Sequence, residues 1–516
     1  MGNASSYIKP VPSSFCVFTM RFHRNFGVLS VLHASEEVQN ALAVTIGKHW
    51  PGGVASQKKP HPTVHCYQLG GYDRESFWTK SVSFSMFCHI LEDLRTIGWH
   101  LLTATDMFLS LEEAELIFQR GEPEKSPDGI SCVRITGKGS LQLINATEAL
   151  QTAATTAVQA TGVKSTTTTD EKENTANAET AAQAPVTITM DGNPWHPSNM
   201  QQRVAGVNVI REVLNALFSS SFNLLPPACL DGEQDALFFC NDGLGGIQAD
   251  HAMIVLCDTG DMLMYRFPAD IQEEVDTLLK QSWSKGMAPA QTFTDAEKYG
   301  PSGSILFRFR EDPWHNATRE NANEIRILFL GVLEALSIRG WKLITTIDVS
   351  EEVNDKSVFL FRQCEDPPKK FIGLQPMNKD RLWLVKMPKE EKDMIEKVLV
   401  STIGDEGIVY HDDFQTTEVY NLKGTPWNPV QNADALLARH IYSVIIATLI
   451  IQGWHVVCSA DLQDDTRMVT VKQTVDKDPK MVKGGGGGGG GGTKQTIITK
   501  HLASCDLHFL IFAKDR

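Results

Sequence analysis

The chain has 516 residues, a formal net charge of −14 and a hydrophobic content of 42%. This composition is typical of soluble globular protein, and the length suggests three or four domains. The acidic balance argues against nucleic-acid binding, because no basic face is available to neutralise phosphates. It also argues against a broad electrostatic membrane surface.

The N-terminal segment, residues 1–14, fits the N-myristoylation pattern. Gly2 follows the initiator Met, and Ser6 stands at the discriminating sixth position. A single myristoyl chain binds membranes only weakly, with an association constant on the order of 10⁴ M⁻¹. We therefore expect reversible attachment, or attachment reinforced by a partner, to the cytoplasmic face of the plasma membrane or Golgi. The alternative is that Gly2 is incidental.

Repeat 1, residues 15–120, is predicted to begin with a β-hairpin and a helix over residues 35–50. A short strand then leads to a long amphipathic helix over residues 77–97. Two further strands, residues 99–105 and 115–119, close the unit. The predicted order is ββαβαββ. It gives an α+β fold in which helices cover one face of a mainly antiparallel sheet.

The end of repeat 1 contains a short sequence motif that recurs along the chain. Gly-Trp opens each copy, and an Asp follows seven residues after the Trp. A second Trp precedes the first by 27 residues in two copies, and a weaker copy keeps that spacing with Phe. A repeated spacing of this kind indicates a tandem array of four units. The motif residues are Trp99, Asp106, Trp195, Phe222, Trp314, Trp341, Asp348, Trp427, Trp454 and Asp461.

The motif residues are interpreted as structural. Each Asp stands where a strand enters a turn, which suits an Asx turn that hydrogen-bonds the backbone. Catalysis by these carboxylates is the alternative. The Trp side chains are interpreted as core residues, with a ligand-binding platform as the alternative.

Repeat 2, residues 131–242, departs from the pattern. Its first helix is not predicted, because residues 152–183 are mostly Ala, Thr and Glu, and we interpret them as a disordered insertion. Phe222 replaces the motif Trp, and Cys229 stands in place of the Asp. The role of the motif is therefore not required in all four repeats.

Repeats 3 and 4, residues 252–362 and 371–516, follow the plan of repeat 1. In repeat 4 the last hairpin is interrupted by a Gly-rich loop, residues 476–500, after a strand predicted at residues 468–475. The most apolar run, residues 441–451, is too short to span a bilayer and is predicted to be a buried helix.

No residue pattern predicts a catalytic, cofactor or metal site. His61, His65 and Cys66 resemble zinc ligands in type, but Pro62 separates the histidines in a predicted loop. The ten cysteines are scattered singly, which is typical of reduced thiols in a cytosolic protein.

The sequence thus predicts a non-enzymatic repeat protein that binds other proteins from the cytoplasmic face of a membrane. No cofactor and no nucleic-acid partner are expected. Two alternatives stay open: an enzyme whose site forms between repeats, and a soluble cytosolic binding protein without a membrane link.

Overall fold

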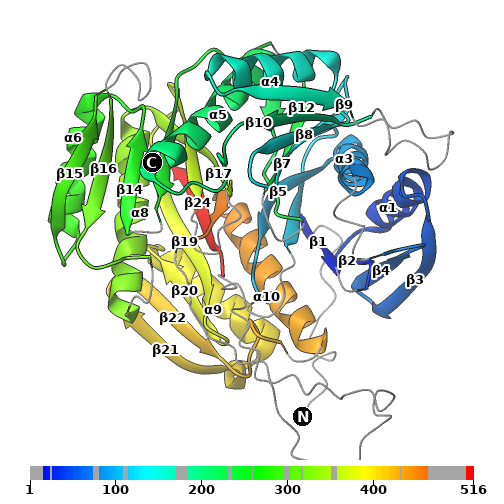
Figure 1. Ribbon diagram of the computed structural model, residues 1–516. Helices are drawn as coiled ribbons and strands as arrows, with labels where there is room; N and C mark the ends of the chain where they lie inside the picture. Colours follow the sequence, from blue (N-terminus) through cyan, green and yellow to red (C-terminus); the bar gives the residue numbers. More distant parts are fainter. Residues whose placement is uncertain are drawn as a thin grey trace, which may run out of the picture.

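The computed structural model shows four similar units placed around a common centre (Figure 1). The described residues are 16–23, 26–73, 81–108, 114–169, 184–230, 235–243, 245–257, 260–294, 303–314, 318–349, 357–429, 432–462 and 507–516. Gly2 and the predicted features at 468–475 and 476–500 lie outside these residues.

Repeats 1 and 2 have the same element order. Repeat 1 contains β1 (Val17–His23), β2 (Val28–Leu32), α1 (Glu36–His49), β3 (Val54–His61), β4 (Val64–Leu69), α3 (Ser81–Thr96), β5 (Trp99–Thr105) and β6 (Glu115–Arg120). Repeat 2 contains β7 (Ile130–Thr136), β8 (Ser140–Ile144), α4 (Glu148–Ala160), β9 (Ser165–Thr169), β10 (Val186–Met190), α5 (Met200–Ser219), β11 (Phe222–Leu224) and β12 (Ala236–Asn241).

Repeats 3 and 4 continue this order. Repeat 3 contains β13 (His251–Leu256), β14 (Asp261–Tyr265), α6 (Ala269–Ser282), β15 (Met287–Phe293), β16 (Ser304–Phe309), α8 (Arg319–Ile338), β17 (Trp341–Ile347) and β18 (Val358–Gln363). Repeat 4 contains β19 (Lys369–Met377), β20 (Arg381–Val385), α9 (Lys389–Ile403), the short 3-10 helix η3 (Asp405–Gly407), β21 (Ile408–Phe414), β22 (Thr417–Leu422), α10 (Asn432–Ile451), β23 (His455–Ala460) and β24 (Phe509–Asp515).

Each repeat forms one six-stranded sheet whose paired strands are antiparallel. In repeat 1 the spatial order is β3-β4-β2-β1-β6-β5, and the other three sheets have the equivalent order. The first strand of each repeat pairs with the second and the last, as in the registers Met20↔Val31 and Phe18↔Phe118. The predicted α+β fold with four antiparallel sheets is confirmed.

Each unit has one strand more than predicted, so its order is ββαββαββ. The additional strands, β3, β9, β15 and β21, lie at the outer edge of their sheets. Most of their residues are exposed. Because both faces of an edge strand can meet water, they lack the alternation of polar and apolar residues that identifies a half-buried strand.

The prediction of a disordered insertion at 152–183 is wrong for its first part. Helix α4 covers residues up to Ala160 and β9 covers Ser165–Thr169, while 170–183 lie outside the described residues. Thr147 caps α4, since its hydroxyl accepts a hydrogen bond from the amide of Leu150 at 3.3 Å. The helix buries a narrow face that includes Ala154, and this small side chain permits close packing against α5.

The helix ends explain why the motif begins with Gly. Gly98, Gly340 and Gly453 follow the second helix of their repeats with φ values of +79°, +77° and +83°. This left-handed conformation is available to Gly without steric cost. Ser221 occupies the same place in repeat 2 with φ 69°.

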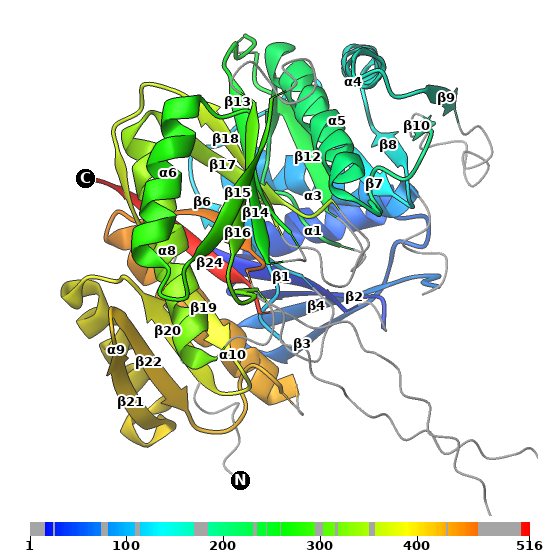
Figure 2. The ribbon, with the colours of Figure 1, turned by 60° about the vertical axis from the view of Figure 1, so that its left-hand side comes forward.

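The second helix of every repeat is shared by two sheets. It lies on its own sheet and also contacts the first strand of the next repeat: α3 on β7, α5 on β13, α8 on β19 and α10 on β1 (Figures 1 and 2). The last of these contacts returns to repeat 1, so the four repeats form a closed ring. We call the contacts joint 1/2, joint 2/3, joint 3/4 and joint 4/1.

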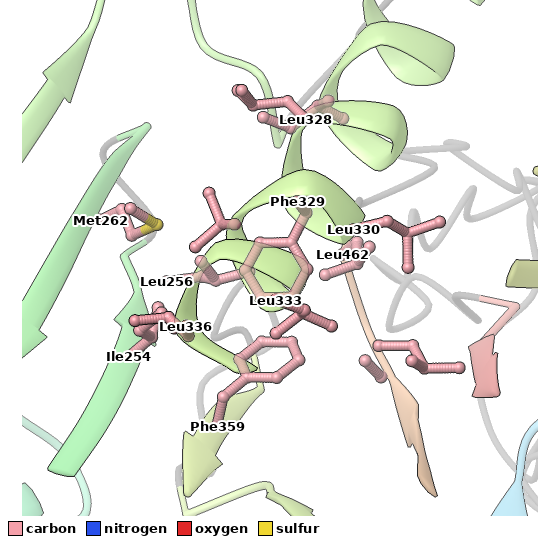
Figure 3. Packing of buried hydrophobic residues seen from close by; sticks show 14 of the residues in the cluster. Ile254, Leu256, Met262, Leu328, Phe329, Leu330, Leu333, Leu336, Phe359 and Leu462 are labelled. Carbon is pink, nitrogen blue, oxygen red and sulfur yellow. The ribbon is translucent and has the colours of Figure 1, made fainter. Parts of the chain in front are cut away.

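The hydrophobic cores reflect this sharing. One continuous cluster joins residues of α8 and its own sheet to side chains from repeat 4. Figure 3 shows α8 between Ile254, Leu256 and Met262 of repeat 3 on one side and Leu462 of repeat 4 on the other. The ring is therefore held by helices buried on two sides.

Helix α10 is longer than the apolar run suggests. Its segment Ala433–Ile451 is long and apolar enough to cross a membrane by length and composition, with a mean hydropathy of 1.6. However, 56% of this segment is buried inside the protein. Its side chains pack with Val17, Phe108 and Ile117 of repeat 1, as expected of a core helix.

Candidate functional site

The joints between repeats bring together the features that recur in the sequence. One helix position faces the neighbouring sheet in a comparable way in every repeat. It lies fifteen residues before the motif aromatic and is occupied by Phe84, Val207, Arg326 and Arg439. The strand position that corresponds to it in the next repeat is held by Arg134, Val255, Gln375 and Arg21, as the strand registers show.

Joint 1/2 pairs an aromatic ring with a cation. The guanidinium of Arg134 lies 4.5 Å from the ring centroid of Phe84, within the range of a cation–π interaction. Ser85 donates a hydrogen bond to Oδ1 of Asn145 at 2.9 Å beside it.

Joint 2/3 is apolar at this position. Val207 is 3% exposed and Val255 is 1% exposed, and both belong to one hydrophobic cluster. Polar contacts surround them: the hydroxyl of Tyr265 donates to Oδ1 of Asn208 at 2.7 Å, and Nε of Arg211 donates to the carbonyl of His251 at 2.8 Å.

Joint 3/4 buries a cation with neutral partners. Arg326 is fully buried, donates from Nε to Oε1 of Gln375, and lies 5.4 Å from the ring centroid of Trp383. Gln375 is held in place because its Nε2 donates to the carbonyl of Leu507 at 2.7 Å. The amide of Gln375 thus gives the guanidinium a neutral acceptor that is held in place.

Joint 4/1 buries an ion pair. Nε of Arg439 donates to Oε1 of Glu115 at 2.7 Å, and the two residues are 4% and 0% exposed. The guanidinium also donates to the hydroxyls of Ser30 at 3.2 Å and Thr19 at 3.1 Å. Arg21 carries the same sign as Arg439, but its guanidinium lies over the ring of Phe108, 4.6 Å from the centroid.

The motif strands carry a second contact between repeats. Strands β5, β17 and β23 each show a register shift after Leu101, Leu343 and Val456 respectively. Such a bulge redirects a side chain. The residue at the shift, or its equivalent in repeat 2, packs against the core of the preceding repeat; these residues are Leu102, Leu225, Ile344 and Val457.

The motif Asp residues lie at the joints and not in a shared pocket. Asp106 forms the predicted Asx turn, because its Oδ1 accepts from the amide of Phe108 at 3.1 Å. Its carbonyl also accepts from the amide of His508, in repeat 4, at 3.0 Å. This second contact is a backbone hydrogen bond between repeat 1 and repeat 4 across joint 4/1.

The other two motif Asp residues make equivalent backbone contacts. The amide of Asp348 donates to Oδ2 of Asp235 in repeat 2 at 2.6 Å, and the amide of Asp461 donates to Oγ of Ser357 in repeat 3 at 2.9 Å. In each case the partner immediately precedes the last strand of the preceding repeat. Sequence reasoning missed these contacts, although the fixed seven-residue spacing was their signal.

The motif aromatic residues are all buried, with exposed fractions between 0% and 2%: Trp99, Trp195, Phe222, Trp314, Trp341, Trp427 and Trp454. Several indole N–H groups reach hydrogen-bond acceptors. Nε1 of Trp195 donates to the carbonyl of Ser140 at 3.1 Å, and Nε1 of Trp454 donates to Oε1 of Glu391 at 2.9 Å. These rings form the core beneath the joints.

The residues that resembled zinc ligands, His61, His65 and Cys66, lie on two adjacent strands. His61 and His65 belong to the β3–β4 hairpin, and Nδ1 of His65 lies 2.9 Å from Oε1 of Gln39. No group of three potential metal ligands was found among the described residues. Burial raises the pKa of the Cys458 thiol to about 12, so this cysteine is not a thiolate at neutral pH.

Comparison with known proteins supports the repeat count. A single domain-family model matches the chain four times, over residues 17–118, 130–240, 250–362 and 370–478. The comparisons with curated proteins and with solved structures found no match. The four matches cover most of the chain, which therefore belongs to this family and carries four tandem copies of its domain.

Proposed function

We propose that this protein is a non-enzymatic adaptor that binds other proteins and attaches reversibly to the cytoplasmic face of a membrane through myristoylated Gly2. The observation that carries the binding part is the use of the recurring motif. Its aromatic, bulged and Asp residues are all used in the cores and joints of the ring. The residues that recur in the sequence therefore form the rigid core and joints of the ring.

The outer edges of the sheets favour multivalent binding. Strands β3 and β9 are largely exposed and β15 and β21 are partly exposed, and all four lie at the sheet edges opposite the motif strands. An exposed edge can receive an extended segment of a partner by strand addition. Four edges held at fixed positions can raise avidity without any single strong contact.

The four edges differ in chemistry, which favours different partners at each. Strand β3 carries Lys58 and Lys59, whereas β21 carries Asp412 and Asp413. Strand β9 consists of Ser and Thr alone. A ring with unlike edges suits an adaptor that joins several proteins in a defined arrangement.

The membrane part rests on the sequence of residues 1–6. Because one acyl chain gives only marginal binding, stable residence at a membrane requires a partner already there. The adaptor and membrane parts of the proposal therefore support each other.

The test is metabolic labelling with a clickable myristate, combined with membrane fractionation and proximity labelling. The wild type should take the label, sediment with membranes and label neighbours there. Gly2→Ala should do none of these, and Ala4→Ser should behave as the wild type because it keeps Gly2 and Ser6. An unlabelled, soluble wild type would reject the membrane part. Loss of every labelled neighbour beyond background would reject the adaptor part.

A further inference from the structure

Joint 4/1 differs from the other joints in its covalent connection. Repeats 1 and 2 are joined by residues 121–129, repeats 2 and 3 by 242–250, and repeats 3 and 4 by 364–368. Repeats 4 and 1 are the two ends of the array. No linker therefore holds the two repeats of joint 4/1 near each other, and opening this joint converts the ring into an open chain.

Two histidines meet at this joint. Nε2 of His33, just after β2, lies 2.8 Å from Nδ1 of His440 on α10. Their rings are 4.9 Å apart and tilted by 59°. His440 is 5% exposed, and it follows Arg439, which makes the buried ion pair with Glu115. The contact requires one ring to donate and the other to accept.

The surrounding groups oppose protonation of this pair. Burial is the main cause that lowers the pKa of His33 to about 3 and that of His440 to about 4. The positive charge of Arg439 and the nearby His61 act in the same direction on His33, and His61 also acts on His440. Cys66 on β4 lies in the field of Arg439 as well. Glu115 adds a carboxylate to this group, and it accepts a hydrogen bond from Arg439.

We propose that the His33–His440 contact makes joint 4/1 an acid-sensitive latch, which opens on protonation of the two imidazoles and releases α10 from the sheet of repeat 1. When both rings are protonated, neither nitrogen can accept, and two cations face each other beside Arg439. Opening exposes both rings to water and removes the repulsion. The three joints with covalent linkers hold the rest of the array together.

The direction of the pH effect follows from the bound protons. The open state has histidines with the ordinary pKa near 6.5, so it binds protons that the closed state excludes. Closure is therefore fully favoured above that pKa and weakens as the pH falls toward the closed-state values. Between pH 7 and pH 5 each histidine shifts the equilibrium about 25-fold toward opening, and two shift it several hundred-fold.

Joint 2/3 provides an internal comparison. It contains one buried histidine, His251, which stacks on Phe218 with ring centroids 5.0 Å apart. Burial lowers the pKa of His251 to about 4. Joint 2/3 should therefore respond to acid about 25-fold at most. At joint 3/4, the helix and strand that meet, α8 and β19, carry no histidine, so little response is expected there.

The test is hydrogen–deuterium exchange of the full chain at pH 7 and pH 5, with labelling times scaled for the intrinsic pH dependence of amide exchange. The amide of His508 donates across joint 4/1 to the carbonyl of Asp106, and peptides that contain it should show a several-hundred-fold rise in the opening equilibrium. The amide of Asp461, which donates across joint 3/4 to Ser357, should not. If the wild-type protein shows no larger acid response at joint 4/1 than at joint 3/4, the proposal is overturned, and no result with a variant can restore it.

A paired substitution sharpens the test. In His33→Gln with His440→Asn, a side-chain amide replaces each imidazole with a group that can donate or accept without titrating. The acid response of the His508 amide should then fall to that of joint 3/4. His455→Gln, at an exposed histidine on β23, should keep the full response. A full response in the paired variant would assign the acid sensitivity to other groups and reject the latch.

Discussion

Joint 4/1 and joint 2/3 bring the equivalent helix onto the equivalent strand but differ in the residue at the same helix position. In joint 4/1, α10 places Arg439 against Glu115 in a buried ion pair. In joint 2/3, α5 places Val207 in an apolar cluster with Val255. A buried ion pair contributes little more stability than an apolar contact of similar size, but it strongly penalises a wrong partner. The difference indicates that helix and sheet are matched joint by joint, which defines the order of repeats in the ring.

The largest expected effect comes from removing one charge of the ion pair. Arg439→Leu leaves Glu115 buried without its cation and should lower the free energy of unfolding by about 3–5 kcal/mol. Urea denaturation followed by tryptophan fluorescence measures this change. The matched control is Arg339→Leu at the end of α8, because its ion pairs with Asp270 and Glu274 are exposed and should contribute about 1 kcal/mol or less. Equal effects of the two substitutions would contradict the account.

The opposite substitution tests the apolar joint. Val207→Arg places a guanidinium among the buried apolar side chains of joint 2/3, so it should destabilise the protein by about 3 kcal/mol. Val44→Arg is the control, since Val44 is 68% exposed on α1 and the change there should stay within about 0.5 kcal/mol. A tolerated Val207→Arg would show that joint 2/3 does not discriminate by charge.

A smaller effect is expected from the polar contact beside Val207. Tyr265→Phe removes the hydrogen bond to Asn208 and should cost about 1 kcal/mol in thermal or urea unfolding. Tyr410→Phe, at a tyrosine that is 53% exposed, should be neutral. If Tyr265→Phe does not change the free energy of unfolding, the hydrogen bond does not stabilise joint 2/3, and the apolar cluster alone holds it together.

The smallest effect is a gain in stability. Ser221 follows α5 with φ 69°, where the other repeats have Gly, so Ser221→Gly should stabilise the protein by about 0.5–1 kcal/mol. Ser220→Gly is the control, because Ser220 has φ −95° and gains nothing from Gly. The midpoint of urea denaturation should rise for the first variant only.

The sequence predicted the features that depend on local periodicity. The repeat count, the motif spacing and the antiparallel α+β units were visible because each repeat reuses the same helix end and buried aromatic residues. The glycine after the helix and the Asx turn at Asp106 are also local, and both are present.

The features that depend on small side chains, or on contacts between residues far apart in the sequence, were not predicted. The apolar face of α4 has the helical spacing, but Ala154 and Ala157 bury so little surface that the pattern is weak. Ring closure depends on Arg439 meeting Glu115, a residue more than 300 positions away, and no periodicity indicates such a contact. The motif carboxylates suggested a hydrogen bond within their own turn, and their spacing did not reveal that the backbone amides of Asp348 and Asp461 also donate across the joints.

The closed ring is tested most directly by a double-mutant cycle on Arg439 and Glu115. Arg439→Leu, Glu115→Leu and the double variant are compared with the wild type by urea denaturation. If repeats 4 and 1 meet as described, the double variant should be more stable than the sum of the single losses by about 2 kcal/mol or more. If the repeats are separate along an open chain, the two losses should add within about 0.5 kcal/mol, and the ring would be contradicted.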